Sequence, residues 1–224
     1  HNTSRARLRC ESMLAVEHWG LIPYREALDR QFEAVDRVSR ELKPETLIFC
    51  SHPPIVTLGR GTKDGDVFGW SGDTIEVGRG GRATYHGPSQ VIVYPVLDLN
   101  SRGRDLHRYM RALEDAILET LESFGVEAVP HAVQKEDGAA EASEATGVWI
   151  GSRKIASIGI GVRRWVSFHG LALNVADDPV AFSGMKPCGF APGSVVSMEE
   201  VLGTLPARET VEARLEQALQ RRFL

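Results

Sequence analysis

The chain has 224 residues, of which 42% are hydrophobic and 25% are charged, and its formal net charge is −4. A chain of this length and composition can bury one sizeable core, and its negative charge argues against a dedicated nucleic-acid binder. No apolar run approaches the roughly 20 residues that span a bilayer, so we expect no membrane span.

Cysteine usage and the N-terminus set further limits. Three cysteines, Cys10, Cys50 and Cys188, do not make a disulfide framework, and they favour a reducing, cytoplasmic compartment. The chain begins with His1 rather than Met, and we expect residues 1–6 to be the remnant of a tag or a trimmed terminus, or to be disordered. No repeat or linker divides residues 1–224, which we interpret as one α/β domain.

The first half of the chain is predicted to contain one helix among several strands. Residues 8–18 are predicted to form one or two strands. Pro23 opens a helix with an apolar stripe that ends before Lys43-Pro44. Further strands are predicted over residues 46–51, 55–58, 73–77 and 90–99. The last of these is nearly all apolar, which indicates a buried central strand.

The second half begins with the clearest helix, residues 105–124, which has apolar positions at a spacing of three and four and Gly125 at its end. The segments after it are predicted as a short strand (126–129), an acidic surface loop (134–145), a hairpin (146–150 and 154–160), a strand interrupted by His169-Gly170 (162–174) and a helix (211–223).

The stretch Gly78–Tyr94 is the most unusual in the chain. Residues 78–82 hold three glycines and two arginines, and an apolar run follows from Val91. Glycine lets the main chain approach a ligand closely, and bare N–H groups beside arginines form a cradle for an anion or a carbonyl. The alternative interpretation is a glycine-rich hairpin turn with solvated arginines.

Three further residues are candidates for chemistry. Cys188 lies between Pro187 and Gly189, where the following amide is open to an oxyanion, and a nearby ammonium such as Lys154 would lower the pKa of its thiol. Lys154 can equally be a lysine at a strand end with its ammonium in water. His169 can equally be a hydrogen-bonded structural histidine.

Several other kinds of site lack their signatures. The histidines and the cysteine outside strands offer no paired spacing for zinc, so no metal site is predicted. No Gly-Lys-Ser/Thr follows the glycines, and no Gly-x-Ser-x-Gly occurs, which excludes a Walker loop and a serine elbow. A papain-like set of Cys188, His169 and Asn174 is possible by composition, but the local sequence of that family is absent.

Four ordered motifs closely resemble the signature of lipoyl(octanoyl) transferases. The first runs from Arg79 to Gln90 and continues through Tyr94-Pro95-Val96-Leu97-Asp98-Leu99; Ser89 stands where the family commonly has glycine. The others are Gly147–Ile150 with Lys154–Gly159, then His169–Asn174, then Pro187-Cys188-Gly189. The resemblance implies a mixed β-sheet flanked by helices, the fold shared with lipoate and biotin protein ligases.

The resemblance also implies a reaction without a cofactor. Octanoyl passes from acyl carrier protein to Cys188 as a thioester, and then to a lysine of a lipoyl domain, in the E2 subunits of 2-oxoacid dehydrogenases or in the glycine cleavage H protein. Lys154 is implied to lower the pKa of Cys188 and to move the proton. The implied substrate-binding residues are Arg79, Gly80, Gly81, Arg82, Ala83, Thr84, Tyr85, His86, Ser157, Ile158, Gly159, Gly170, Leu171 and Ala172.

Two rival functions remain open from the sequence. A lipoate or biotin ligase would need ATP and no nucleophilic cysteine, and a catalytically silent relative would only bind acyl carrier protein or a lipoyl domain.

A monomer is expected. Val91, Val93 or Ile158 could wall a tunnel for the acyl chain. The candidates for docking an acidic partner are Arg60, Arg79, Arg82, Arg163 and Arg164.

Overall fold

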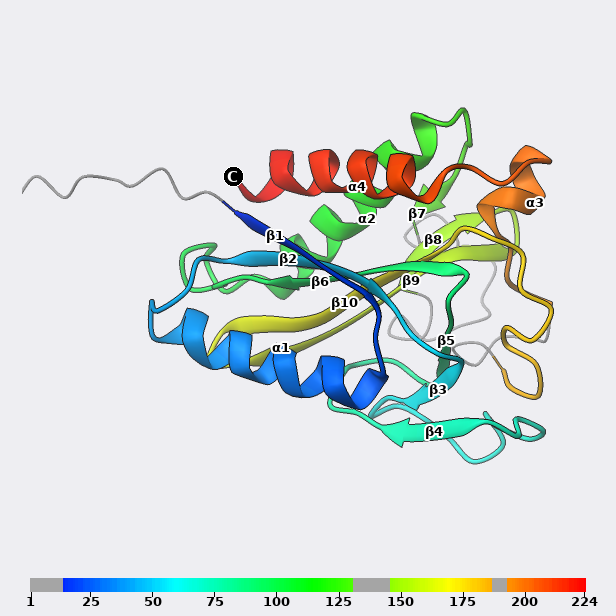
Figure 1. The fold of residues 1–224 in the computed structure, drawn as a ribbon, viewed down its shortest axis with the longest axis horizontal. Coiled ribbons are helices and arrows are strands. Elements are labelled where there is room, and N and C mark those ends of the chain that lie inside the picture. Colours follow the sequence, from blue (N-terminus) through cyan, green and yellow to red (C-terminus); the bar gives the residue numbers. More distant parts are fainter. Residues whose placement is uncertain (1–13, 131–145, 187–192) are drawn as a thin grey trace, which may run out of the picture.

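A mixed seven-stranded sheet forms the centre of the protein in a computed structural model, which describes residues 14–130, 146–186 and 193–224 (Figure 1). The strand order is β1-β2-β6-β10-β9-β8-β7. β1 and β2 pair in parallel, and every other neighbouring pair is antiparallel. The strands are Ala15–Leu21 (β1), Thr46–Ser51 (β2), Gln90–Val96 (β6), Val129–Pro130 (β7), Gly147–Ile150 (β8), Arg153–Arg163 (β9) and Val166–Asn174 (β10).

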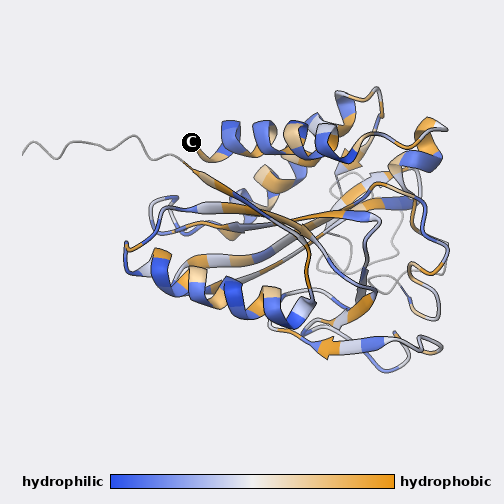
Figure 2. Ribbon diagram, viewed as in Figure 1, coloured by the Kyte–Doolittle hydropathy of each residue, from blue (hydrophilic) through white to orange (hydrophobic). Residues whose placement is uncertain are grey.

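Helices cover both faces of this sheet. In Figure 1, α1 (Tyr24–Ser39) lies on one face, and α2 (Leu106–Glu122) with α4 (Arg208–Phe223) lies on the other. The strands between them alternate as the period of two requires: Ile92 and Tyr94 of β6 pack with α1, whereas Val91 and Val93 pack with α2 and α4. Figure 2 shows the hydrophobic stripes of the helices toward the sheet and their hydrophilic residues outward. The fold is therefore the mixed sheet flanked by helices that the resemblance implies.

A second, three-stranded sheet carries the glycine–arginine turn. β3 (Ile55–Leu58) pairs in parallel with β4 (Asp73–Glu76) and antiparallel with β5 (Thr84–His86). The glycine–arginine turn, residues 78–83, connects β4 to β5. The short helix α3 (Met198–Leu202) follows β10 in the described chain, and the Ser197 hydroxyl caps it by accepting from the N–H of Glu200 at 3.0 Å.

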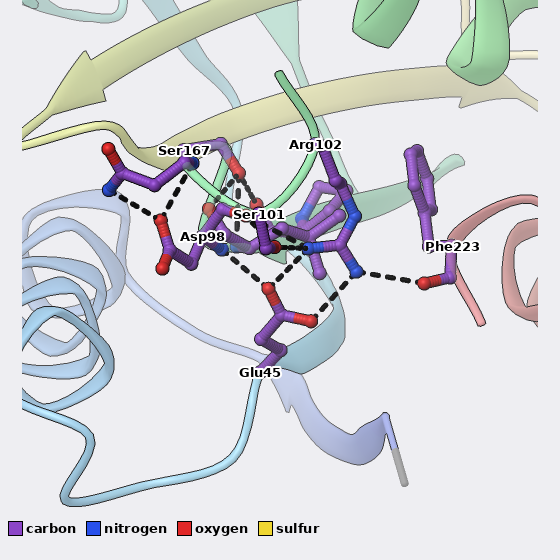
Figure 3. Close-up of polar contacts among 9 residues, drawn as sticks. Glu45, Asp98, Ser101, Arg102, Ser167 and Phe223 are labelled. Atoms are coloured by element: carbon purple, nitrogen blue, oxygen red, sulfur yellow. Dashed lines mark hydrogen bonds and ion pairs between the residues drawn. The ribbon is translucent and has the colours of Figure 1, made fainter. Parts of the chain in front are cut away.

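A polar cluster at one end of the main sheet ties separate segments together (Figure 3). The two Nη atoms of Arg102 donate to the two carboxylate oxygens of Glu45, at 2.5 and 2.8 Å. Arg102 Nη2 also donates to the Phe223 carbonyl at 2.8 Å, and the N–H of Asp98 donates to Glu45 Oε1 at 2.6 Å. The cluster thereby fixes the loop after β6 against the start of β2 and the end of α4.

Most of the elements expected from the sequence are confirmed. The three long helices, the strands at 46–51, 55–58 and 73–76 and the hairpin of β8 and β9 lie where the patterns predict them. The expected strand 126–129 is wrong, because only Val129 and Pro130 pair. The expected strand 162–174 is two strands, since β9 runs to Arg163 and β10 begins at Val166.

The interruption expected at His169-Gly170 is also wrong, because both residues pair with β9 inside a continuous β10. β5 and α3 were not expected at all. The predictions for residues 1–6, 8–13 and 134–145, and for Cys188, lie outside the described residues.

Candidate active site

Small residues on two central strands leave a hollow in the face of the sheet that α1 covers. Ser157 and Gly159 of β9 pair with Ala172 and Gly170 of β10, so the four residues share one face. The residues that alternate with these four along β9 and β10, such as Ile158 and Leu171, pack into the core with α2 and α4. The four small residues line a central pocket, whose empty volume including open solvent is about 490 Å³.

The glycine–arginine turn packs over this floor. The N–H of Gly80 donates to the Ile160 carbonyl of β9 at 3.0 Å. A Cβ on Gly59 would lie 2.3 Å from the Gly81 carbonyl oxygen, and a Cβ on Gly159 would lie 3.0 Å from Arg79 Cδ. Glycine is therefore required for this close approach of turn, loop and strand.

Arg79 cross-links the turn from inside. Its side chain donates to the carbonyls of Gly80, Arg82 and Thr57 at 2.9 Å each, and to the Thr57 hydroxyl at 2.7 Å. The residue is only 5% exposed. All of these acceptors are neutral oxygen atoms of the protein. Arg79 therefore stabilises the conformation of the turn and is not a surface cation for docking.

Arg82 is held by a buried carboxylate. Its Nε donates to Asp66 Oδ2 at 2.9 Å, and its Nη2 forms an ion pair with Oδ1 of the same residue. Burial opposes ionisation of Asp66, but the hydrogen bonds from Arg82 and from the Lys63 N–H bring the pKa of that carboxyl below its usual value. The backbone carbonyl of Asp66 accepts from the N–H of Lys186 at 2.7 Å. Asp66 thus links the pocket wall to the segment that leads toward Cys188.

Aromatic and imidazole rings close the far end of the central pocket. Tyr24, Tyr94, His86 and His169 line it there, and His52 lies behind them. The Tyr24 hydroxyl lies 3.3 Å from His169 Nδ1, and His52 Nε2 accepts from the Tyr94 hydroxyl at 2.6 Å. Burial lowers the pKa of His52 to about 4 and that of His169 to about 3, so both rings are neutral near pH 7.

His169 has an unusual backbone for a strand residue. Its φ is +56°, in the left-handed region that non-glycine residues rarely adopt. The side chain of Gln31 in α1 stabilises this backbone by accepting from the His169 N–H at 2.8 Å. Sustained strain of this kind is characteristic of functional sites, and here it lies in the wall of the central pocket.

Lys154 lies at the opposite end of the pocket. It is 3% exposed, its Nζ donates to the Thr146 carbonyl at 3.4 Å, and Nζ lies 4.9 Å from the centre of the Trp149 ring. Thr146 lines the central pocket. The N–H of Lys154 donates to the Ser194 carbonyl at 2.8 Å. The interpretation of Lys154 as a lysine with its ammonium in water is therefore wrong.

All but two of the implied substrate-binding residues gather around the central pocket. The exceptions are Ala83 and Tyr85, which pack with Val56, Phe182 and Met185 in a separate cluster. Their neighbours Thr84 and His86 line the pocket, because successive side chains of the strand β5 point to opposite sides. Val91 and Val93 pack on the α2 side of the sheet and do not line the pocket, whereas Ile158 does.

Four residues of the lining were not among the predicted binding residues: Tyr24, Tyr94, Thr146 and His169. Of these, only His169 was a candidate on its own. Asn174, which composition grouped with it, donates to the Val196 carbonyl at 3.1 Å and does not line the central pocket.

Two negative findings apply to the described ranges. Among those residues, no three His, Cys, Asp or Glu side chains gather in a way that could hold a metal ion. No helix in those ranges has both the length and the apolar character needed to cross a membrane.

Comparisons with known proteins identify relatives over most of the chain. The family model for the lipoyl protein ligase A/B catalytic domain matches residues 23–220. An octanoyltransferase of Bdellovibrio bacteriovorus is 46% identical over 197 residues, which cover 85% of this chain and 90% of that protein.

Two solved structures share the fold. A bi-partite lipoate protein ligase of Thermoplasma acidophilum has a TM-score of 0.62 at 15% identity, covering 93% of this chain and 83% of the other. A biotin protein ligase of Aquifex aeolicus has a TM-score of 0.54 at 8% identity, with coverages of 95% and 69%.

Proposed function

Because the chain belongs to the octanoyltransferases and carries the lipoyl protein ligase A/B catalytic domain, it transfers octanoyl groups in protein lipoylation, and we propose that it does so through a thioester on Cys188. Its acceptors are lipoyl-domain proteins. The donor in this proposal is octanoyl-acyl carrier protein. The acceptors in the proposal are the lipoyl domains of 2-oxoacid dehydrogenase E2 subunits and of the glycine cleavage H protein. The enzyme acts as a monomer.

The first step of the proposal is thioester exchange. The Cys188 thiolate attacks the octanoyl carbonyl carbon, a new carbon–sulfur bond forms, and the bond to the carrier thiol breaks. Lys154 takes the proton of the Cys188 thiol and delivers it to the departing carrier thiolate. A thiolate is needed as the nucleophile, and an adjacent ammonium favours it.

The second step forms the amide. The ε-amine of the acceptor lysine attacks the Cys188 thioester, the carbon–nitrogen bond forms, and the carbon–sulfur bond breaks. Lys154 passes the proton of the amine to the leaving Cys188 thiolate. Both steps balance without ATP, because the thioester already carries the activated acyl group.

The observation that carries this proposal is the central pocket between Lys154 and the buried rings. Its floor consists of glycine, alanine and serine, whose short side chains suit contact with an unbranched acyl chain, and the carbonyl of Thr146 in its lining accepts from Lys154 Nζ. Cys188 follows Lys186 by two residues and precedes Ser194 by six, and these two contact Asp66 and Lys154 respectively. The described chain on each side of the cysteine therefore contacts a residue, Asp66 or Lys154, that is bonded to the lining of the pocket.

Docking of an acidic partner is the second part of the proposal. Arg79 is buried and Arg82 is paired with Asp66, so neither is a surface cation. Arg60 and Arg163 are exposed, whereas Arg164 is exposed but paired with Asp36 at 2.9 Å. We assign the attraction of the partner to Arg60 and Arg163.

Intact-protein mass spectrometry after treatment with octanoyl-acyl carrier protein tests the intermediate. We expect one octanoyl adduct in the wild type and none in Cys188→Ser, with turnover abolished in Cys188→Ala. Lys154→Ala should retain the cysteine but acquire the adduct at least tenfold more slowly, since it loses its proton carrier.

Cys50→Ser is the matched control. Cys50 is buried in β2, and burial raises the pKa of its thiol, so this variant should acquire the adduct like the wild type. An adduct that persists in Cys188→Ser would show that another residue is the nucleophile. Transfer that requires ATP would instead identify a ligase.

A further inference from the structure

Two hollows in the described part of the protein share Tyr24 in their linings. This residue lines the central pocket, and it also lines an outer groove whose empty volume is about 700 Å³ including open solvent. The outer groove is formed by Pro23, Arg25, Pro53, Pro54, Ile55 and their neighbours. Tyr24 is the one described residue that lines both, and its ring lies beside His86 and His169 of the central pocket.

The central pocket runs across the strands toward this residue. It begins at Thr146 and Ser157 on the Lys154 side, passes Ala172 and Gly170 of β10, and reaches Tyr94 of β6. The strand order β9-β10-β6 fixes that direction. Tyr24 lies at the end of this path, as the first residue of α1.

Neighbouring rings hold the Tyr24 side chain in place. Its ring lies 4.9 Å from that of His52, edge to face, and 5.6 Å from that of His86, stacked. Its hydroxyl lies 3.3 Å from His169 Nδ1, and the residue is 3% exposed. A ring fixed on three sides forms a rigid wall.

We propose that Tyr24 sets the length of the acyl chain that the enzyme accepts. This inference rests on the proposed function, because it requires the acyl chain to lie in the central pocket with its thioester toward Lys154. The methyl end of the chain then meets the Tyr24 ring, and additional methylenes can fit only if the ring moves. Loss of the ring joins the pocket to the outer groove, where carbons of Pro53, Pro54 and Ile55 can contact the longer chain.

The test compares transfer to a lipoyl domain from octanoyl- and dodecanoyl-acyl carrier protein. The measured quantity is the ratio of kcat/KM for dodecanoyl to that for octanoyl. We expect this ratio to rise about tenfold or more in Tyr24→Ala, because removing the wall changes the fit of several methylenes. Tyr24→Leu should raise the ratio by less.

Two variants separate the wall from other effects. Tyr24→Phe keeps the ring and loses the contact with His169, so it should keep the wild-type ratio. Tyr109→Leu shortens a buried tyrosine in the core with α2 and α4, away from the central pocket, and is matched to Tyr24→Leu. It should also keep the wild-type ratio.

Each of the remaining outcomes contradicts either the role of Tyr24 in chain length or the proposed octanoyl transfer. A wild-type ratio in folded Tyr24→Ala, or an equal rise in Tyr24→Phe or Tyr109→Leu, overturns the role of Tyr24. Thermal unfolding checks the fold of each variant, and Tyr24→Leu is judged by the same criteria where Tyr24→Ala does not fold. Failure of the wild type to transfer octanoyl overturns the proposed donor reaction itself.

Discussion

Buried histidines surround the far end of the central pocket, and their protonation links the pocket to stability. The His52 ring is satisfied on both sides, because Nδ1 donates to the Ile22 carbonyl at 2.7 Å and Nε2 accepts from Tyr94. Burial lowers the pKa of His52 to about 4, and it lowers the pKa of His86 and His169 as well. The unfolded chain takes up protons on these rings below about pH 6.5, whereas the folded chain does not.

The free energy of unfolding should therefore fall as the pH falls from 7 to 5. His52 alone contributes about 2 kcal/mol of this loss, since the unfolded state binds its proton first. The stability is complete above about pH 6.5, and the loss due to His52 ends near pH 4, where the folded ring is protonated too. Urea unfolding at pH 7 and pH 5 measures the difference.

The variant His52→Gln should show a smaller pH dependence than the wild type by about the same 2 kcal/mol. The exposed His107 provides the control, and His107→Gln should keep the wild-type dependence. An unchanged slope in His52→Gln would contradict the assignment of a neutral buried ring.

At the scale of elements, one loop connects the two sides of the candidate site. Residues 59–69 lie between the glycine–arginine turn and the segment 184–186. The N–H of Gly61 donates to the Gly81 carbonyl at 3.0 Å, and the N–H groups of Phe68 and Gly69 both donate to the Gly184 carbonyl at 2.9 Å. Asp66 adds the ion pair with Arg82, so the loop holds the pocket wall and the chain before Cys188 in one arrangement.

Asp66→Asn should lower the free energy of unfolding by roughly 3 kcal/mol, because it removes one charge of the mostly buried ion pair with Arg82. The side chains of the pair are 1% and 12% exposed. Chemical denaturation measures the loss. Asp64→Asn, an exposed change in the same loop, is the control and should cost little.

Asp66→Asn combined with Arg82→Gln should cost less than the sum of the two single changes, since each single change already removes the interaction between the two side chains. Additive losses would mean that the two side chains are not coupled.

The sequence predicts the elements that have a strong period and misses those that do not. α1 and α2 follow from apolar stripes, and the β8–β9 hairpin follows from its Gly151-Ser152 turn. β5 has only three residues and lies beside a run of glycines, so no alternation could reveal it. α3 is also short, with five residues, although Ser197 with Glu200 is the pattern of a capped helix start.

The sequence likewise predicts some residues of the candidate site and misses others. The glycine-rich motifs point to the turn and the floor, because close backbone approach needs glycine. Tyr24 and Tyr94 lie in apolar patterns, where a core residue and a pocket residue look alike. Ala83 and Tyr85 fall within a motif that lines the pocket, but strand alternation turns them away from it. Only three-dimensional packing distinguishes these cases.

At the scale of the whole molecule, the Arg102 cluster joins segments that are distant in sequence. Glu45 directly precedes β2, Asp98 lies in the loop after β6 and Phe223 is the last residue of α4. The Arg102 and Glu45 side chains are about one-quarter exposed, so the pair is partly shielded from water. Its two parallel hydrogen bonds require the planar guanidinium.

Arg102→Lys should reduce the free energy of unfolding by about 1 kcal/mol, because lysine cannot make the paired hydrogen bonds. Arg153→Lys is the matched control, since Arg153 pairs with Glu200 at an exposed site and should change stability little. Urea unfolding at low and high salt measures both variants. Equal losses would show that the cluster adds nothing beyond a surface ion pair.

The place of β6 between β2 and β10 has a consequence for how the protein is made. All residues of β6 are buried in the folded chain, and its partner β10 begins only at Val166. At a synthesis rate of 5–20 residues per second, roughly 4–16 s pass between the completion of β6 and that of β10. During that interval an apolar strand has an open edge, which is the feature that promotes aggregation between chains. We therefore expect the ribosome-bound chain to be more prone to aggregation before β10 is complete than after it.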